Sequence, residues 1–176
     1  ILNNDGSLTV TNSTFSGNSA QSGGGGGGIW NGGESTVTVT NTILANSISG
    51  GNCGGSVTYG GHNLDSDGTC GVGPATDPML APGLADHGGQ IQTIALEPNS
   101  PAINAGDQAV CANPPVNGVD QRGFTRPGSG HTQCSIGAYE ADAFSPEPCV
   151  GDCDGTGSVT VDEIITLVNV ALGTTQ

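Results

Sequence analysis

The densest set of carboxylate side chains in this 176-residue chain lies near its C-terminus, between residues 152 and 163. Aspartate, threonine and serine occupy alternate positions there, and a glutamate closes the segment. Alternate positions of a tight loop can turn their oxygens toward one centre, and a hard cation such as Ca²⁺ takes about six to eight oxygen ligands. The segment therefore predicts a Ca²⁺ site rather than an acidic turn that only precedes a helix. The predicted ligands are Asp152, Asp154, Thr156, Ser158, Thr160 and Glu163.

The order of these residues matches the twelve-residue EF-hand loop at every defined position except the fifth, where Thr156 stands. Gly157 at the sixth position permits a sharp turn, Ser158 offers its backbone carbonyl, and Thr160 offers a water-mediated contact. Glu163 closes the loop with two carboxylate oxygens. Threonine at the fifth position removes one negative charge, so we expect weak affinity, with a Kd of about 10⁻⁴ to 10⁻³ M.

A short amphipathic helix is expected directly after this loop. Gly173 stands where the helix would end, and Pro146 and Pro148 disfavour a helix before the loop. Because an isolated helix of about three turns is marginal in water, we expect a second loop–helix unit or a partner module to cover its apolar face, and the tail itself to be mobile. The alternative is a helix folded back on the body around residues 136–139. The apolar residues at helical spacing are Ile164, Leu167, Val168, Ala171 and Leu172.

Residues 149–176 resemble one half of a dockerin, the duplicated calcium module that attaches enzymes to scaffold proteins. The resemblance lies in the loop and in the apolar pattern of residues 161–173. It implies a cohesin-like scaffold module as partner, or another cell-surface or glycan component. A dockerin has two such units and this segment shows one. Either a second unit lies beyond Gln176, or the segment is a single calcium appendage.

The six cysteines form three couples that are local in sequence, which predicts three disulfides. A zinc site would need two close couples, or one couple with histidines at fixed offsets, and the three histidines are scattered. Disulfides imply an oxidising compartment and therefore an exported protein. Each should stabilise the fold by about 2–4 kcal/mol. The predicted pairs are Cys53–Cys70, Cys111–Cys134 and Cys149–Cys153.

The elements that precede the loop are predicted to be the strands of a repeat. Residues 8–14 and 37–43 are closely similar, and Val10 and Val39 are 29 residues apart. Alternation of apolar residues with threonine has the period of two of a strand, whereas the glycine run at 23–28 is predicted to be a loop. One short strand per repeat buries its apolar face only when successive repeats stack. The repeat therefore predicts a solenoid.

Two asparagines recur in the same repeat. Asn12 and Asn41 share the inward parity of the neighbouring valines, so they could form a ladder of stacked amides at a corner of the solenoid. Asn63 is a candidate for the third position of that ladder. The alternative is that all three are ordinary turn residues, which asparagine favours.

These segments resemble bacterial right-handed parallel β-helix proteins, in particular those related to the polymorphic outer-membrane protein repeats. The stretch 62–140 resembles the C-terminal end of the β-helix class known as choice-of-anchor proteins. The resemblance implies the fold and an exported location, and it implies no catalytic residue. The matching segments of the second stretch are residues 61–70, 77–80, 100–106, 120–123, 126–127 and 136–140.

Composition and charge agree with an all-β chain outside the C-terminal helix. With 32 glycines and 10 prolines a helical bundle is excluded. The net charge of −14 repels nucleic acid and anionic membranes, and no apolar run approaches the ~20 residues of a membrane span. Together with the resemblance described above, these observations lead us to expect the end of a right-handed parallel β-helix with a small C-terminal calcium loop–helix. Its expected parts are β-helix rungs (1–72), terminal rungs and cap (73–142), a linker (143–148) and the dockerin-like segment (149–176).

Few residues are candidates for catalysis. A lyase that removes a proton next to a uronate needs a strong base, and Arg122 and Arg126 are the only cationic side chains apart from histidine. We expect Arg122 to pair with Asp120 and to tie down the terminal loop. Asp65 and Asp67 are candidates for the two carboxylates of a glycosidase, but their setting fits a turn closed by the first predicted disulfide better.

The sequence thus predicts an extracellular, non-catalytic surface or scaffold-attached protein whose C-terminal loop binds Ca²⁺. The alternative is a fragment of an extracellular polysaccharide lyase or glycoside hydrolase whose catalytic rungs lie upstream. A pair of groove-facing carboxylates, or a lone arginine on a rung face, would distinguish the second from the first.

Overall fold

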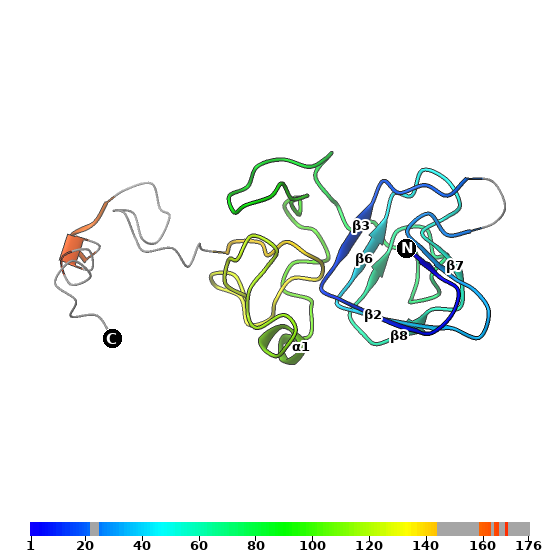
Figure 1. The fold of residues 1–176 in the computed structure, drawn as a ribbon. Coiled ribbons are helices and arrows are strands. Elements are labelled where there is room, and N and C mark those ends of the chain that lie inside the picture. The colour runs from blue at the N-terminus through cyan, green and yellow to red at the C-terminus, as the bar shows by residue number, and fades with distance from the viewer. Residues whose placement is uncertain (22–24, 144–158, 163, 166–167, 169–176) are drawn as a thin grey trace.

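The computed structural model describes residues 1–21, 25–143, 159–162, 164–165 and 168. Within these residues every strand pairing is parallel, and the strands form three sheets with the orders β1-β4-β7, β2-β5-β8 and β3-β6-β9. One circuit of the chain adds one strand to each sheet. Three such circuits, called rungs here, stack like those of a parallel β-helix (Figure 1). The expected all-β architecture of stacked parallel strands is confirmed at this level.

The strands are short and all lie before residue 66. They are β1 (Leu2–Asn3), β2 (Ser7–Thr11), β3 (Thr14–Ser16), β4 (Ile29–Asn31), β5 (Thr36–Thr40), β6 (Ile43–Ala45), β7 (Cys53–Gly55), β8 (Thr58–Tyr59) and β9 (Leu64–Asp65).

The register of β2 on β5 is the one that the repeat predicts. Val10 lies beside Val39, and Leu8 lies beside Val37. Val37 and Val39 are fully buried, whereas Thr38 between them is only half-buried, because side chains of a strand alternate between its two faces. The repeat of 29 residues is therefore the length of the first circuit, whereas the second is shorter, because Val39 pairs with Tyr59 and Ile43 with Leu64.

Glycines allow the rungs to come close where the chain passes from one to the next. Gly27 and Gly28 lie in a loop, as predicted for the described part of the run, and donate backbone hydrogen bonds to the carbonyls of Gly51 and Asn52 in the following rung. A Cβ added to Gly54 would lie 2.5 Å from Cε3 of the Trp30 ring. A larger residue at position 54 would therefore push this ring away from the backbone.

Two clusters of apolar side chains form a small core. The first lies between the sheets and the second joins β6 to the part of the chain that follows the strands. The members of the first are Val10, Ile29, Val37, Val39, Leu44, Cys53, Cys70 and Val72. The members of the second are Ile43, Ala45, Ala102 and Ile136.

After Cys70 and Val72, which belong to the core between the sheets, the chain up to residue 143 forms a lobe beside the stack, on the side of β3 and β6 (Figure 1). The lobe consists of turns, isolated antiparallel bridges such as Leu80 with Leu96, and the short helix α1 (Gln108–Ala112). Two of the predicted disulfides are confirmed, Cys53–Cys70 and Cys111–Cys134. The first holds β7 to the segment that leads into the lobe, and the second holds α1 within the lobe. No helix in the described part of the chain is long and apolar enough to cross a membrane.

Candidate functional site

Most of the predicted calcium loop lies outside the described residues. This applies to Asp152, Asp154, Thr156, Ser158 and Glu163, and also to the predicted Cys149–Cys153 disulfide, all of which remain predictions. Thr160 is described, and its carbonyl accepts a hydrogen bond of 3.1 Å from the amide of Ile164. Residues 161, 162, 164, 165 and 168 are helical, so helix begins where the loop pattern places it. Among the described residues no cluster of three or more histidine, cysteine or acidic side chains could hold a metal ion.

The described helical residues expose their apolar side chains. Val161 is 71% exposed, and Ile164, Ile165 and Val168 are each at least half exposed. Near residues 136–139, where the alternative places the helix, Ile136 is only 4% exposed because it packs in the core cluster with Ile43, whereas Ala138 and Tyr139 are half-buried. Both arrangements of the helix remain predictions.

The corner between the second and third sheets contains the asparagine ladder. Asn12 and Asn41 both have positive φ, 44° and 49°, a conformation that asparagine tolerates better than most residues. The side-chain amide of Asn41 donates to Oδ1 of Asn12 at 3.1 Å, and both side chains are buried. The ladder is confirmed for these two residues.

The prediction that Asn63 takes the third position of the ladder is wrong. Ile43 pairs with Leu64, so the residue level with Asn41 is His62, whose φ is 52°. The third corner contains one more residue than the first two, because both Gly60 and Gly61 stand between β8 and this position. Asn63 instead accepts from the amide of Thr42 and donates to the carbonyl of Val39.

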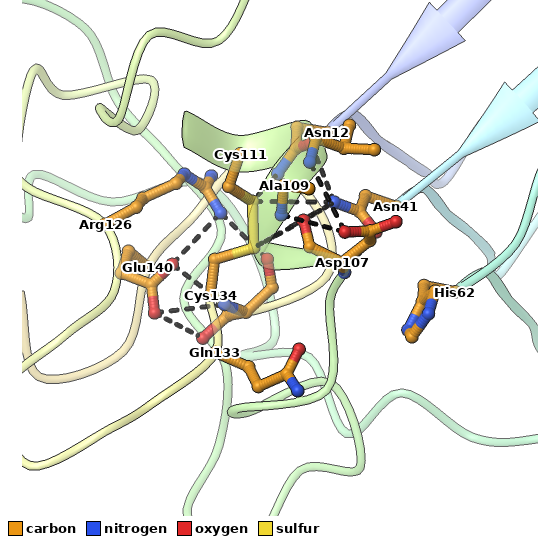
Figure 2. The surroundings of a disulfide bond; sticks show 12 residues. Asn12, Asn41, His62, Asp107, Ala109, Cys111, Arg126, Gln133, Cys134 and Glu140 are labelled. Atoms are coloured by element: carbon orange, nitrogen blue, oxygen red, sulfur yellow. Dashed lines mark hydrogen bonds and ion pairs between the residues drawn. A yellow bond between two sulfur atoms is a disulfide. The ribbon is translucent and has the colours of Figure 1, made fainter. Parts of the chain in front are cut away.

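The asparagine corner holds the lobe against the stack. Asn41 and Asp107 form a reciprocal pair, in which Asp107 N donates to Asn41 Oδ1 at 2.8 Å and Asn41 Nδ2 donates to the carbonyl of Asp107 at 3.1 Å. Asp107 also caps α1 by accepting from Ala109 N. Asn12 Nδ2 lies 3.0 Å from Sγ of Cys111, within the Cys111–Cys134 disulfide (Figure 2). Asn12 of the first rung and Asn41 of the second therefore link the repeat to the lobe.

A buried ion pair lies next to this joint. Arg126 Nη1 is 3.1 Å from Glu140 Oε2, and their side chains are 1% and 0% exposed. Arg126 also donates to the carbonyls of Ser135 and Gly137, and Glu140 accepts from the amides of Gly128 and Ser135. Burial lowers the pKa of Arg126, and the charge of Glu140 opposes that effect. The ion pair therefore holds together the two ends of the segment 126–140.

The predicted ion pair between Arg122 and Asp120 is confirmed, with an Nη2–Oδ2 distance of 2.7 Å. The guanidinium also lies 3.8 Å from the ring centre of Tyr139 and 4.2 Å from that of Phe124. Both arginine side chains are almost completely buried. Neither presents an accessible base of the kind that a lyase needs.

Asp65 and Asp67 form the predicted turn. Asp65 is buried and accepts from the amide of Cys70 at 2.7 Å and from the side chain of Asn52 at 2.8 Å. Partial burial raises the pKa of Asp67, but hydrogen bonds from Thr69 and Asn52 outweigh it and hold the pKa below its ordinary value. Both carboxylates therefore serve to close the third rung.

Sequence reasoning missed the pairing of Arg126 with Glu140 and the role of Asn52. A signal for the first existed: in a chain with two arginines and no lysine, each arginine was a candidate for a structural ion pair. Asn52 lies in a Gly-Gly-Asn-Cys segment that looks like an ordinary turn. Only the structure shows that it is buried and that its side chain donates a hydrogen bond to Asp65.

A scan against protein-family models, a search of curated proteins and a search of solved structures found no match to this chain.

Proposed function

We propose that this chain is a non-catalytic part of an extracellular, surface- or scaffold-attached protein of the right-handed parallel β-helix type, and that its C-terminal loop binds Ca²⁺. The stacked body would act as a rigid spacer, and the loop–helix as the attachment segment. Two disulfides in the described residues support the extracellular location.

The observation that carries the proposal is the exposed apolar helix directly after the ligand pattern. Ile164 bonds back to the carbonyl of Thr160, the ninth residue of the pattern, which is compatible with an EF-hand loop passing into its exit helix. A bound Ca²⁺ would supply the charge that holds the acidic loop closed. Asp152, Asp154 and Glu163 would be its carboxylate ligands, and the helix that follows would present Val161, Ile164, Ile165 and Val168 to a partner.

The non-catalytic part of the proposal is supported by the structural roles of the buried charged side chains in the stack and the lobe. Arg122 and Arg126 are buried in ion pairs, and the buried carboxylates of Asp65 and Glu140 are satisfied by backbone amides. These groups hold loops in place and do not converge on one accessible centre.

Isothermal titration of the full chain with CaCl₂ tests the calcium site. We expect one site with a Kd of about 10⁻⁴ to 10⁻³ M, lost in Glu163→Gln and retained in Glu97→Gln. The control removes the same charge from an exposed position of the body, so it corrects for diffuse binding to an acidic chain. No heat, or equal heat from Glu163→Gln and the parent, would contradict the site. Release of unsaturated or reducing oligosaccharides from a polysaccharide panel would contradict the non-catalytic role.

A further inference from the structure

Among the residues that the structure describes, the three sheets all end on the same side of the stack in a strand paired with one other strand, namely β1, β2 and β3. In a parallel ladder, the backbone groups of successive residues point alternately to the two sides. The amide of Asn12 donates to the carbonyl of Thr40 in β5. Residues of the same parity in β2 therefore face β5, and the amides of Thr9 and Thr11 point to the other side. Thr9 is an exposed residue.

A groove runs along this edge and is bounded by the lobe. A cavity of about 550 Å³ separates the corner at residues 11–15 from Pro115, Val116 and Val119. A second cavity of about 600 Å³ continues along residues 8–11 to Ile1 and shares Pro115 with the first. We call the two together the edge groove. The lobe thus extends past the outermost rung and forms a wall beside space that this rung does not fill.

The chemistry of the edge groove favours an uncharged extended strand. Its apolar lining includes Leu8, Phe15 and Val119, the last of which is 40% exposed. The charged residues in the lining, Asp120 and Arg126, already have ion-pair partners. The free amides of Thr9 and Thr11 can pair with the backbone of an added strand.

The opposite side of β2 shows which sequence fits such an edge. There β5, with the sequence Thr-Val-Thr-Val-Thr, pairs over five residues and places Val37 and Val39 beside Leu8 and Val10. The Asn41 that follows donates to Asn12. A strand of the same pattern on the free side would bury alternate valines and bring its asparagine level with Asn12.

We propose that the edge groove binds an uncharged strand of the Thr-Val-Thr-Val-Thr-Asn type, which adds in parallel to β2 as a further rung and turns its corner against Pro115, Val116 and Val119. A second copy of this chain fits less well. Two identical edges related by a twofold axis would pair antiparallel, and the other edge strand of this sheet, β8, pairs with β5 over only two residues.

The test uses a fluorescein-labelled peptide with the sequence of residues 35–47, titrated with the full chain and followed by fluorescence anisotropy. We expect saturable binding and slower hydrogen exchange at the amides of Thr9 and Thr11. Thr9→Pro removes the outward amide and should weaken binding at least tenfold, whereas the matched control Thr9→Ala keeps the amide and should bind like the parent. A peptide with aspartate in place of both valines should not bind.

Val119→Asp provides a second variant, in the lobe and outside the sheet, should Thr9→Pro fail to fold. It should also weaken binding at least tenfold. The proposal is overturned if the peptide shows no saturable binding. It is also overturned if Val119→Asp binds the peptide like the parent and Thr9→Pro, where it folds, does so too. Self-association of the full chain that Thr9→Pro abolishes would assign the edge to a second copy and would overturn it as well.

Discussion

Replacing Glu140 with glutamine should destabilise the protein strongly. The change leaves the Arg126 guanidinium without its counter-charge in a place where its side chain is only 1% exposed. It also replaces one carboxylate oxygen by an NH₂ group that cannot accept from the amides of Ser135 and Gly128. Removing one partner of a buried ion pair costs about 3–5 kcal/mol. We expect a loss of that size in the free energy of unfolding.

Urea denaturation followed by circular dichroism measures this loss as a fall in the transition midpoint at constant slope. Glu97→Gln is the matched control, because it makes the same chemical change at an exposed position and should alter stability by no more than about 0.5 kcal/mol. Arg126→Met combined with Glu140→Gln should cost less than the sum of the single changes, since the double variant no longer buries an unpaired charge. A loss below about 1 kcal/mol in Glu140→Gln would refute the assignment of a tightly coupled buried pair.

Two further predictions concern the corner and the third rung. Asn41→Gly keeps a residue that accepts positive φ but removes the hydrogen bonds to Asn12 and Asp107; it should lower stability by about 1–3 kcal/mol in urea denaturation, and Asn46→Gly, at an exposed position with φ of 55°, is its control. Because the pKa of Asp67 is lowered in the folded state, its contribution is present above the unfolded value near 3.8 and is lost as pH falls through the lower folded value. The melting temperature, measured between pH 5 and about pH 2, should therefore fall less steeply with decreasing pH in Asp67→Asn than in the parent. An equal dependence on pH would show that the hydrogen bonds from Thr69 do not favour the charged form.

Features that depend on local pattern were predictable. The recurrence of Val10 at Val39 sets the length of the first circuit, because similar short strands can bury their apolar faces only by stacking in register. The disulfides Cys53–Cys70 and Cys111–Cys134 were predictable because each couple lies close along the chain, so a short loop brings the two thiols together. The ion pair of Arg122 with Asp120 has the same origin.

Features that depend on exact register or on distant segments were decided only by the tertiary structure. Asn63 was a candidate for the third position of the ladder, but the third corner contains one more residue than the first two, so that position falls to His62. The alternation of residues along a strand does not reveal such an insertion at a corner. The reciprocal pair of Asn41 with Asp107 joins residues 66 positions apart. Asn41 meets Asp107 only once the lobe has packed against the stack, and Arg126 meets Glu140 only once the lobe itself has folded.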